Sequence, residues 1–325
     1  MPLDDHHLGD DLGPGSDDRT AARGHAHHDH GVAPGADRRY LRWALALLVA
    51  FLVAEVVVAV LAHSLALLSD AGHMLSDVGA LGAALWAMHL AARPAQGAWT
   101  FGWHRAEILS AAANGVTLLV VSGVVTVEAV QRLVEPGPVH GPSLLLTALA
   151  GVAVNLAATW VLAKANRSSL NVEGAFQHLL TDLYGFAATA VAGVVIIATG
   201  WTRADPSASL VVVVLMLRAA WGLLRDSGRI LLEAAPEGFD LEQVRAHLLE
   251  SDHVHDVHDL HVWTVTSRLP ALSAHVVIDD SCFLDGHAPQ LLDQLQACLQ
   301  GHFDVEHSTF QLEPVGHDTH EGGTH

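Results

Sequence analysis

The stretch "ALLSDAGHMLSDVGALGAALWAMHL", residues 66–90, is almost wholly apolar, yet three ionisable side chains lie in its first half. On a helix Asp70, His73 and Asp77 are spaced i, i+3 and i+7, so they share one face. An ionisable group inside a membrane helix costs about 2.5–3.5 kcal/mol on insertion scales and therefore tends to mark an ion path. Asp70 is the weakest of the three, since near the outer end it could simply attract cations.

Five further apolar segments extend this pattern along the chain: 41–62, 106–128, 143–164, 173–199 and 205–224. Each is close to the ~20 residues that a helix needs to cross a bilayer. Backbone groups in hydrocarbon must bond within the chain, so helices are expected. The chain of 325 residues is 51% hydrophobic with a mean hydropathy of +0.33. These features predict an all-α bundle of six transmembrane helices over residues 38–230.

Basic residues indicate the orientation. Six spans place both ends of the chain on one side, and only two basic residues, Arg132 and Arg203, fall in the loops of the other side. The flanks on the first side carry Arg38, Arg39, Arg42, Arg93, Arg105, Lys164, Arg167, Arg225 and Arg229. The positive-inside rule therefore predicts that both termini are cytoplasmic. The membrane that we expect is the cell (inner) membrane. A net charge of −19 argues against a nucleic-acid partner.

Polar sequence surrounds the predicted bundle. Residues 1–37 are rich in Asp, Gly, Pro and His, include "HAHHDH" at 25–30, and are predicted to be a disordered cytoplasmic tail. Residues 236–314 show an α-β-β-α-β pattern, typical of a small α+β domain with a helix layer on one face of a sheet. Residues 315–325 form a second disordered, histidine-containing tail. The two cysteines, Cys282 and Cys298, are too few for a disulfide framework.

The fifth span repeats the pattern of the second in "GAFQHLLTDLYG", residues 174–185. His178 and Asp182 are spaced i, i+4, as are His73 and Asp77. At 1.5 Å per residue, Asp77 lies ~16 Å from the outer end of its span, and the second pair ~9–15 Å from the inner end of the fifth. Two imidazoles and two carboxylates at one depth form a tetrahedral N2O2 set that zinc accepts. A single such residue could instead only bond a neighbouring helix, and we expect Glu55, Glu107, Asn114 and Asn155 to join helices in this way or to line a cavity.

Four motifs together resemble the cation diffusion facilitator family, in its zinc-transporting branch. They are "SLALLSDAGHMLSDVGALG" (64–82), "FGWHRAEILSAAANG" (101–115), "NVEGAFQHLLTDLYG" (171–185) and "VHDLHVWTVTS" (257–267) followed by "LSAHVVI" (272–278). The resemblance implies a six-helix bundle, a cytoplasmic metallochaperone-like domain, a homodimer and the exchange of metal for protons. It places transport ligands on His73, Asp77, His178 and Asp182. It also implies a cytoplasmic metal site, matched best by His258, His275 and Glu313.

The expected function is therefore export of Zn2+ from the cytoplasm in exchange for protons, by alternating access. Protonation of a ligand imidazole removes a lone pair, and histidine titrates near pH 6.5, so protons can compete with the metal. Cd2+ and Co2+ remain open as further substrates. No enzymatic step is expected: the chain has no G-x-x-x-x-G-K-[ST] loop, and no organic cofactor is predicted.

Three alternatives stay open from the residues alone. Asp77 and Asp182 could form the dyad of an intramembrane protease, although such a dyad needs no histidine at i−4. The chain could also be a metal sensor whose spans only anchor it. Finally, His258, His261 and His275 lie on predicted neighbouring strands, with Gln311 and Glu313 on the last, and these strand histidines could simply face water; His253, His255, His287 and His307 receive no role.

Overall fold

The computed structural model describes residues 34–61, 65–136, 141–167, 169–266, 269–305 and 307–317. The N-terminal tail up to residue 33, with the "HAHHDH" cluster, lies outside the described residues, as do residues 318–325. Within α2 the backbone is described throughout, but the side chains of residues 65–73 lie outside the described set. Two predicted positions, Asp70 and His73, are therefore placed on α2 by their backbone alone.

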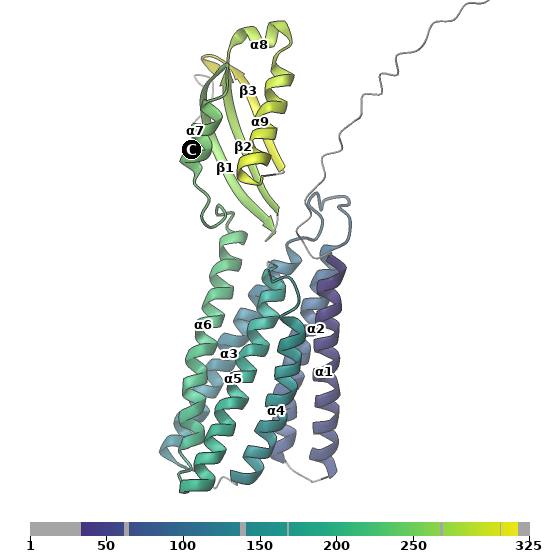
Figure 1. The fold of residues 1–325 in the computed structure, drawn as a ribbon, viewed down its shortest axis with the longest axis vertical. Coiled ribbons are helices and arrows are strands. Elements are labelled where there is room, and N and C mark those ends of the chain that lie inside the picture. The colour runs from purple at the N-terminus through teal and green to yellow at the C-terminus, as the bar shows by residue number, and fades with distance from the viewer. Residues whose placement is uncertain are drawn as a thin grey trace, which may run out of the picture. The chain divides into compact units, whose positions relative to one another are not determined.

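The described residues form six long helices followed by a small α+β domain (Figure 1). The six helices are α1 (Pro34–Leu61), α2 (Leu65–Ala91), α3 (Ala106–Val134), α4 (Gly141–Leu162), α5 (Leu170–Thr199) and α6 (Ala204–Leu231). Five of them are long and apolar enough to cross a membrane; in α2 the apolar run among residues with described side chains is Asp77–Ala91. The predicted bundle of apolar helices is confirmed, and this is a multi-pass membrane protein.

Helix α5 lies at the centre of the bundle, since it packs against α2, α3, α4 and α6. Leu179 and Val172 on α5 join a core with Leu81 on α2, Leu48 on α1 and Leu162 on α4. A second core joins α3 and α6. The position of α5 means that a polar side chain on its inner faces is surrounded by protein rather than by lipid.

Helix α1 begins at Pro34, inside the segment that the sequence predicted to be a tail. The side chain of Asp37 is buried and accepts a hydrogen bond at 2.8 Å from the backbone N–H of Asn166, between α4 and α5. Arg38 donates to the carbonyl oxygen of Met88 on α2 at 2.8 Å. These two polar contacts fix this end of α1, so residues 34–37 belong to the bundle.

The C-terminal domain contains α7 (Leu241–Leu249), β1 (Val254–Thr266), β2 (Leu269–Ile278), α8 (Asp280–Asp285), α9 (Ala288–Phe303) and β3 (His307–Pro314). The described strands form one sheet in the order β1-β2-β3, antiparallel between β1 and β2 and parallel between β2 and β3. The predicted α+β class is confirmed. The short helix α8 is an addition to the predicted α-β-β-α-β order.

One face of the sheet forms the domain core. Val244 and Leu248 of α7 and Leu291, Leu295 and Leu299 of α9 pack with Leu272, Ala274, Val276 and Ile278 of β2. Because side chains alternate along a strand, Ser273, His275 and Val277 point to the opposite face. The alternation of side chains along β2 therefore separates an apolar face of the sheet from a face that carries polar side chains such as His275.

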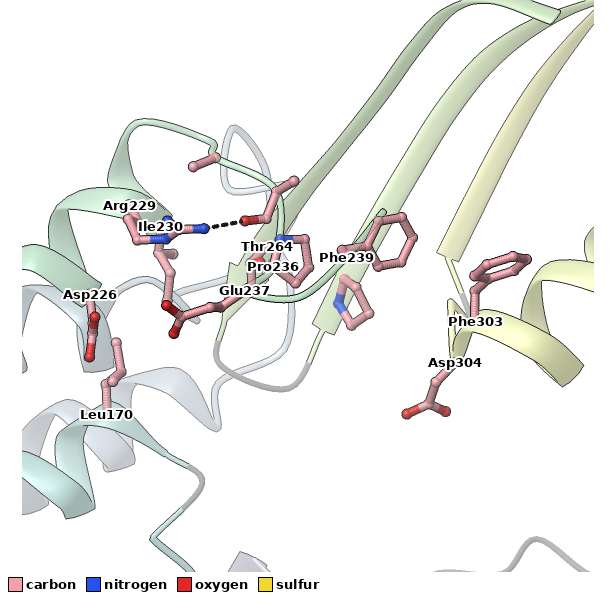
Figure 2. A pocket seen from close by; sticks show the side chains of 13 residues that line it. Leu170, Asp226, Arg229, Ile230, Pro236, Glu237, Phe239, Thr264, Phe303 and Asp304 are labelled. Carbon is pink, nitrogen blue, oxygen red and sulfur yellow. Dashed lines mark hydrogen bonds between the residues drawn. The ribbon is translucent and has the colours of Figure 1, made fainter. Parts of the chain in front are cut away.

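A linker joins α6 to α7. In it, Arg229 at the end of α6 donates a hydrogen bond to the carbonyl oxygen of Ala235 at 2.9 Å (Figure 2). Asp240 then caps α7, because its side chain accepts from the backbone N–H groups of Glu242 and Gln243 at 3.0 and 3.3 Å. An open pocket of about 450 Å³ borders this linker, and Phe239 and Asp304 are among the side chains that line it.

Candidate metal centres

The intramembrane centre lies between α2 and α5. Asp77 Oδ1 is 2.9 Å from His178 Nε2, and Asp182 Oδ2 is 3.7 Å from the same nitrogen. One ligand atom of each residue lies within 4.8 Å of the others. The sequence spacing explains half of this arrangement: His178 and Asp182 share a face of α5 because they are one turn apart. The packing of α2 on α5 supplies Asp77.

The three side chains border a cavity of about 230 Å³ inside the bundle. It is walled by apolar residues of four helices, among them Met74 on α2, Leu118 on α3, Phe186 on α5 and Met216 on α6. The side chain of His178 is only 4% exposed, and those of the two aspartates are 16% and 19% exposed. Such a setting is expensive for two carboxylates unless a cation or protons compensate them.

His73, the fourth predicted transport ligand, lies on α2 one turn before Asp77. Its side chain lies outside the described residues, so the fourth position of the set remains a prediction. Asp70 has the same status. The described part of the centre is therefore a cluster of one imidazole and two carboxylates.

Polar residues elsewhere in the bundle hydrogen-bond to backbone and side-chain groups of its helices. Asn114 on α3 donates to the carbonyl oxygen of Gly174 on α5 at 2.8 Å, and Ser169 donates to Glu107 at 3.2 Å. These contacts between helices match the structural role predicted for Asn114 and Glu107. Asn155 instead bonds within its own helix, to the carbonyl oxygen of Gly151 at 3.2 Å.

Asn171 is a residue that sequence reasoning missed. It lies on α5, is 2% exposed, and donates a hydrogen bond to the carbonyl oxygen of Ala84 on α2 at 2.8 Å. It is seven residues before His178, on the same side of α5, and Ala84 is seven residues after Asp77. This bond therefore fixes the register of the two helices that carry the cluster. Its sequence signal was only an asparagine at the start of an apolar helix.

A second centre lies on the exposed face of the C-terminal sheet. His275 Nδ1 is 2.8 Å from Glu313 Oε1, and His258 Nε2 is 3.3 Å from Glu313 Oε2. The strand registers explain the arrangement: His258 pairs with His275 across β1 and β2, and His275 pairs with Gln311 across β2 and β3. Glu313 itself is almost fully buried, with a side chain 2% exposed. The structure brings together all three residues that the resemblance selected.

A bulge in β1 places one more histidine, His261, on the same face of the sheet. Val257 and Val262 both pack in the core, although they are five residues apart and a regular strand would put them on opposite faces. The register shifts between His258 and His261, and Asp259 has a positive φ of 50°. The extra residue reverses the alternation, so that His258 and His261 both lie on the ligand face.

Two of the unassigned histidines have a structural partner. His255 and His253 hydrogen-bond the two carboxylate oxygens of Asp279 at 2.6 and 2.9 Å. These two hydrogen bonds, first that of His255 and then that of His253, lower the pKa of Asp279 from its ordinary value. The bonds connect the start of β1 with the end of β2.

The chain is similar along most of its length to known proteins. The family described as "Cation efflux transmembrane domain" matches residues 41–232, and "Cation efflux protein, cytoplasmic domain" matches residues 236–315. A buried imidazole and carboxylate cluster within a bundle of membrane helices defines the class: a multi-pass membrane protein built around a candidate metal site. The chain belongs to the cation efflux family, which confirms the resemblance and the expected role as a cation efflux transporter.

Two relatives illustrate the match. The "Cadmium, cobalt and zinc/H(+)-K(+) antiporter" of Bacillus velezensis is 35% identical over 293 residues, 90% of this chain and 93% of the relative. The "Zinc transporter ZitB" of Escherichia coli is 38% identical over 294 residues, 90% of this chain and 92% of the relative. Among solved structures, the metal-bound C-terminal domain of the CzcD transporter from Cupriavidus metallidurans is 35% identical and covers 23% of this chain and 99% of that chain, with a TM-score of 0.21.

Proposed function

We propose that this protein exports Zn2+ from the cytoplasm in exchange for protons, by alternating access to the intramembrane cluster. The observation that carries the proposal is the approach of Asp77 and Asp182 to one buried imidazole, at 2.9 and 3.7 Å from His178 Nε2. Imidazole and carboxylate together form a donor set that Zn2+ accepts, and His73 is the fourth ligand of the proposal. Cadmium and cobalt, named for the Bacillus relative, are further candidate substrates.

Proton exchange follows from the competition for the same atoms. A proton on the imidazole nitrogen or on a carboxylate oxygen occupies the electron pair that the metal needs. A protonated cluster therefore has a low metal affinity, and a deprotonated cluster a high one. If the cluster opens alternately to each side, a proton gradient directed inward drives metal outward. Transport of this kind requires no covalent step and no organic cofactor.

The basic loops support an orientation with both termini in the cytoplasm, in the cell membrane. In this orientation the C-terminal domain meets cytoplasmic metal, and we infer that His258, His275 and Glu313 bind Zn2+ there. Two imidazoles and a buried carboxylate fit that ion. We also infer a homodimer that associates through this domain, and assign no nucleic-acid partner. The proposed domains are a bundle over 34–230, which includes the start of α1, and a cytoplasmic domain over 236–314, with polar tails at both ends.

The alternative of a protease dyad has less support from the geometry. In an aspartic dyad two carboxylates share one proton directly. Here an imidazole accompanies the two carboxylates, since His178 Nε2 lies 2.9 Å from Asp77 and 3.7 Å from Asp182, and a protease dyad has no need of it. That arrangement favours a cation between the carboxylates.

The test is zinc flux in sealed vesicles with an imposed pH gradient. Asp77→Ala and Asp182→Ala, each removing one oxygen ligand, are expected to abolish the flux that the gradient drives. Glu128→Ala is the matched control, because it removes an exposed carboxylate from the same bundle. Wild-type flux in either aspartate variant, at equal amounts of inserted protein, would refute the four-ligand site. Cleavage of a membrane peptide by metal-free protein would instead support the protease.

A further inference from the structure

A third group of metal-ligating side chains lies on the helix layer of the C-terminal domain. His247 is on α7, and Cys298 and His302 are one turn apart on α9, so both point from the same face of that helix. One ligand atom from each of the three lies within 4.8 Å of the others. The group is separate from the strand ligands, because α7 and α9 cover the opposite face of the sheet. Neither the sequence motifs nor the proposed transport site uses it.

The spacing of the two imidazoles suits a tetrahedral ion. His247 Nε2 is 3.2 Å from His302 Nδ1, and the rings meet edge to face with centroids 4.6 Å apart. Two nitrogens that each bind zinc at 2.0–2.1 Å in tetrahedral geometry are separated by roughly 3.3 Å. An ion could therefore be bound by both nitrogens with little movement of either helix.

The surroundings of His247 also suit a metal ligand. Its other ring nitrogen, Nδ1, is 3.3 Å from a carboxylate oxygen of Glu250, one turn later. A ligating histidine commonly donates its second N–H to a carboxylate, which fixes the ring and makes the ligand more basic. The ring of Phe303 packs against the same imidazole edge to face, with 5.7 Å between the ring centroids.

A direct hydrogen bond between the rings is the simpler explanation of the histidine pair. His302 Nδ1 also lies 3.2 Å from the carbonyl oxygen of Cys298, so one N–H could be shared between that oxygen and His247. That explanation gives no role to the Cys298 thiol. A bound ion would use the sulfur and both nitrogens at once, so the participation of sulfur separates the two explanations.

We propose that His247, Cys298 and His302 form a cytoplasmic binding site for one borderline or soft divalent cation, such as Zn2+, Cd2+ or Co2+. On binding, the Cys298 sulfur loses its proton to solvent and forms a bond to the metal, while both imidazoles bind as neutral ligands. Three protein ligands leave a fourth position for water. A thiolate ligand disfavours Mg2+ and Mn2+, so this site is more selective for soft ions than the nitrogen and oxygen cluster in the bundle.

The site would join α7 to α9. Apart from this group, α7 and α9 share the apolar core over the sheet, and Phe239, just before α7, contacts Phe303 of α9. A bound ion would therefore stabilise the helix layer, whereas the strand site stabilises the sheet. A soft metal ion in the cytoplasm would thus change the stability of the domain by binding at a surface that is separate from the intramembrane cluster.

Cobalt provides a direct test on the full chain in detergent. A thiolate bound to Co2+ gives a charge-transfer band in the near ultraviolet that nitrogen and oxygen ligands do not give. The chain has two cysteines, and Cys282 on α8 is 1% exposed, so the band reports on Cys298. We expect the band to saturate at the intensity of one thiolate-bound Co2+ per chain in the wild type and in the matched control Cys282→Ser, whatever amount of Co2+ the sites without sulfur take up.

The band should be absent from Cys298→Ser and should need at least tenfold more Co2+ in His247→Gln and in His302→Gln. His302 is exposed, so His302→Gln tests the site without disturbing the core. Lack of a band in the wild type at saturating Co2+, or an unchanged midpoint in both histidine variants, would overturn the proposal. The optical readout needs no transport, so it fails or succeeds independently of the proposed export.

Discussion

Replacing Gly151 by alanine should disturb the intramembrane cavity through Phe186 of α5, which lies between Gly151 and the cavity. Gly151 lies on α4, and a Cβ atom added there would be 2.3, 2.5 and 2.6 Å from three ring carbons of Phe186. Carbon atoms in contact normally lie about 3.5–4.0 Å apart, so the ring must move by about 1 Å or more. Overpacking of this kind typically costs about 1–3 kcal/mol.

The displaced ring has a functional consequence, because Phe186 also lines the cavity that contains Asp77, His178 and Asp182. A ring that moves away from α4 moves toward the cavity. If even about 1 kcal/mol of the cost falls on the metal-loaded state, zinc flux should decrease about fivefold. We therefore expect Gly151→Ala to lower both the thermal unfolding midpoint and the flux.

Vesicle flux and thermal unfolding of the purified protein together test this reasoning. The matched control is Gly123→Ala on α3, the same chemical change at a helical glycine with no atom within 4 Å of the added Cβ. That variant should be neutral or stabilised by up to about 1 kcal/mol. Gly151→Ala combined with Phe186→Leu should recover flux, because the smaller side chain leaves room. Unchanged flux and midpoint in Gly151→Ala would refute the coupling between this contact and the cavity.

Three further predictions concern the polar parts of the chain. Glu313→Gln should weaken zinc binding at the sheet at least tenfold, about 1.4 kcal/mol, and remove the zinc-dependent protection of the β3 amides in hydrogen exchange. Asp279 has a lowered pKa in the folded state, so its stabilising effect is present above its unfolded pKa of about 3.9 and is lost as the pH falls through the folded value. The free energy of unfolding, measured in urea at pH 7 and at pH 3, should therefore differ less between the two pH values in Asp279→Asn than in the wild type. The imidazoles of the N-terminal tail can bind metal loosely and raise its concentration near the cytoplasmic entrance. Deleting residues 2–33, which ends before α1, should therefore raise the apparent KM for zinc but not the maximal flux, and loss of flux at saturating zinc would contradict this role of the tail.

The sequence alone was sufficient for features that depend on local periodicity. The i, i+4 pair of His178 and Asp182 is a local pattern. The α-β-β-α-β order, read from local patterns too, predicted a helix layer on one face of the sheet, and Leu272, Ala274, Val276 and Ile278 form the face beneath it. The apolar runs likewise predicted the membrane helices, because hydrocarbon leaves few other backbone solutions.

Other features depend on contacts between distant segments and could not be read from spacing. No pattern indicates that Asn171 bonds the carbonyl of Ala84 or that His247 meets His302 across two helices. The bulge at Asp259 was not predicted either, because strict alternation is the simplest expectation for a strand. Helix α8 has only six residues, too few for a helical period to show.

The two faces of the C-terminal sheet can vary independently of each other. Residues that pack against α7 and α9 form the apolar core of the domain, whereas the ligands that we propose for the sheet, His258, His275 and Glu313, lie on the other face. Substitutions among His, Asp, Glu and Cys at these three positions leave the apolar core unchanged. A lineage or a protein engineer could therefore adapt the domain to a different metal by a few changes on one surface, without having to stabilise the fold again.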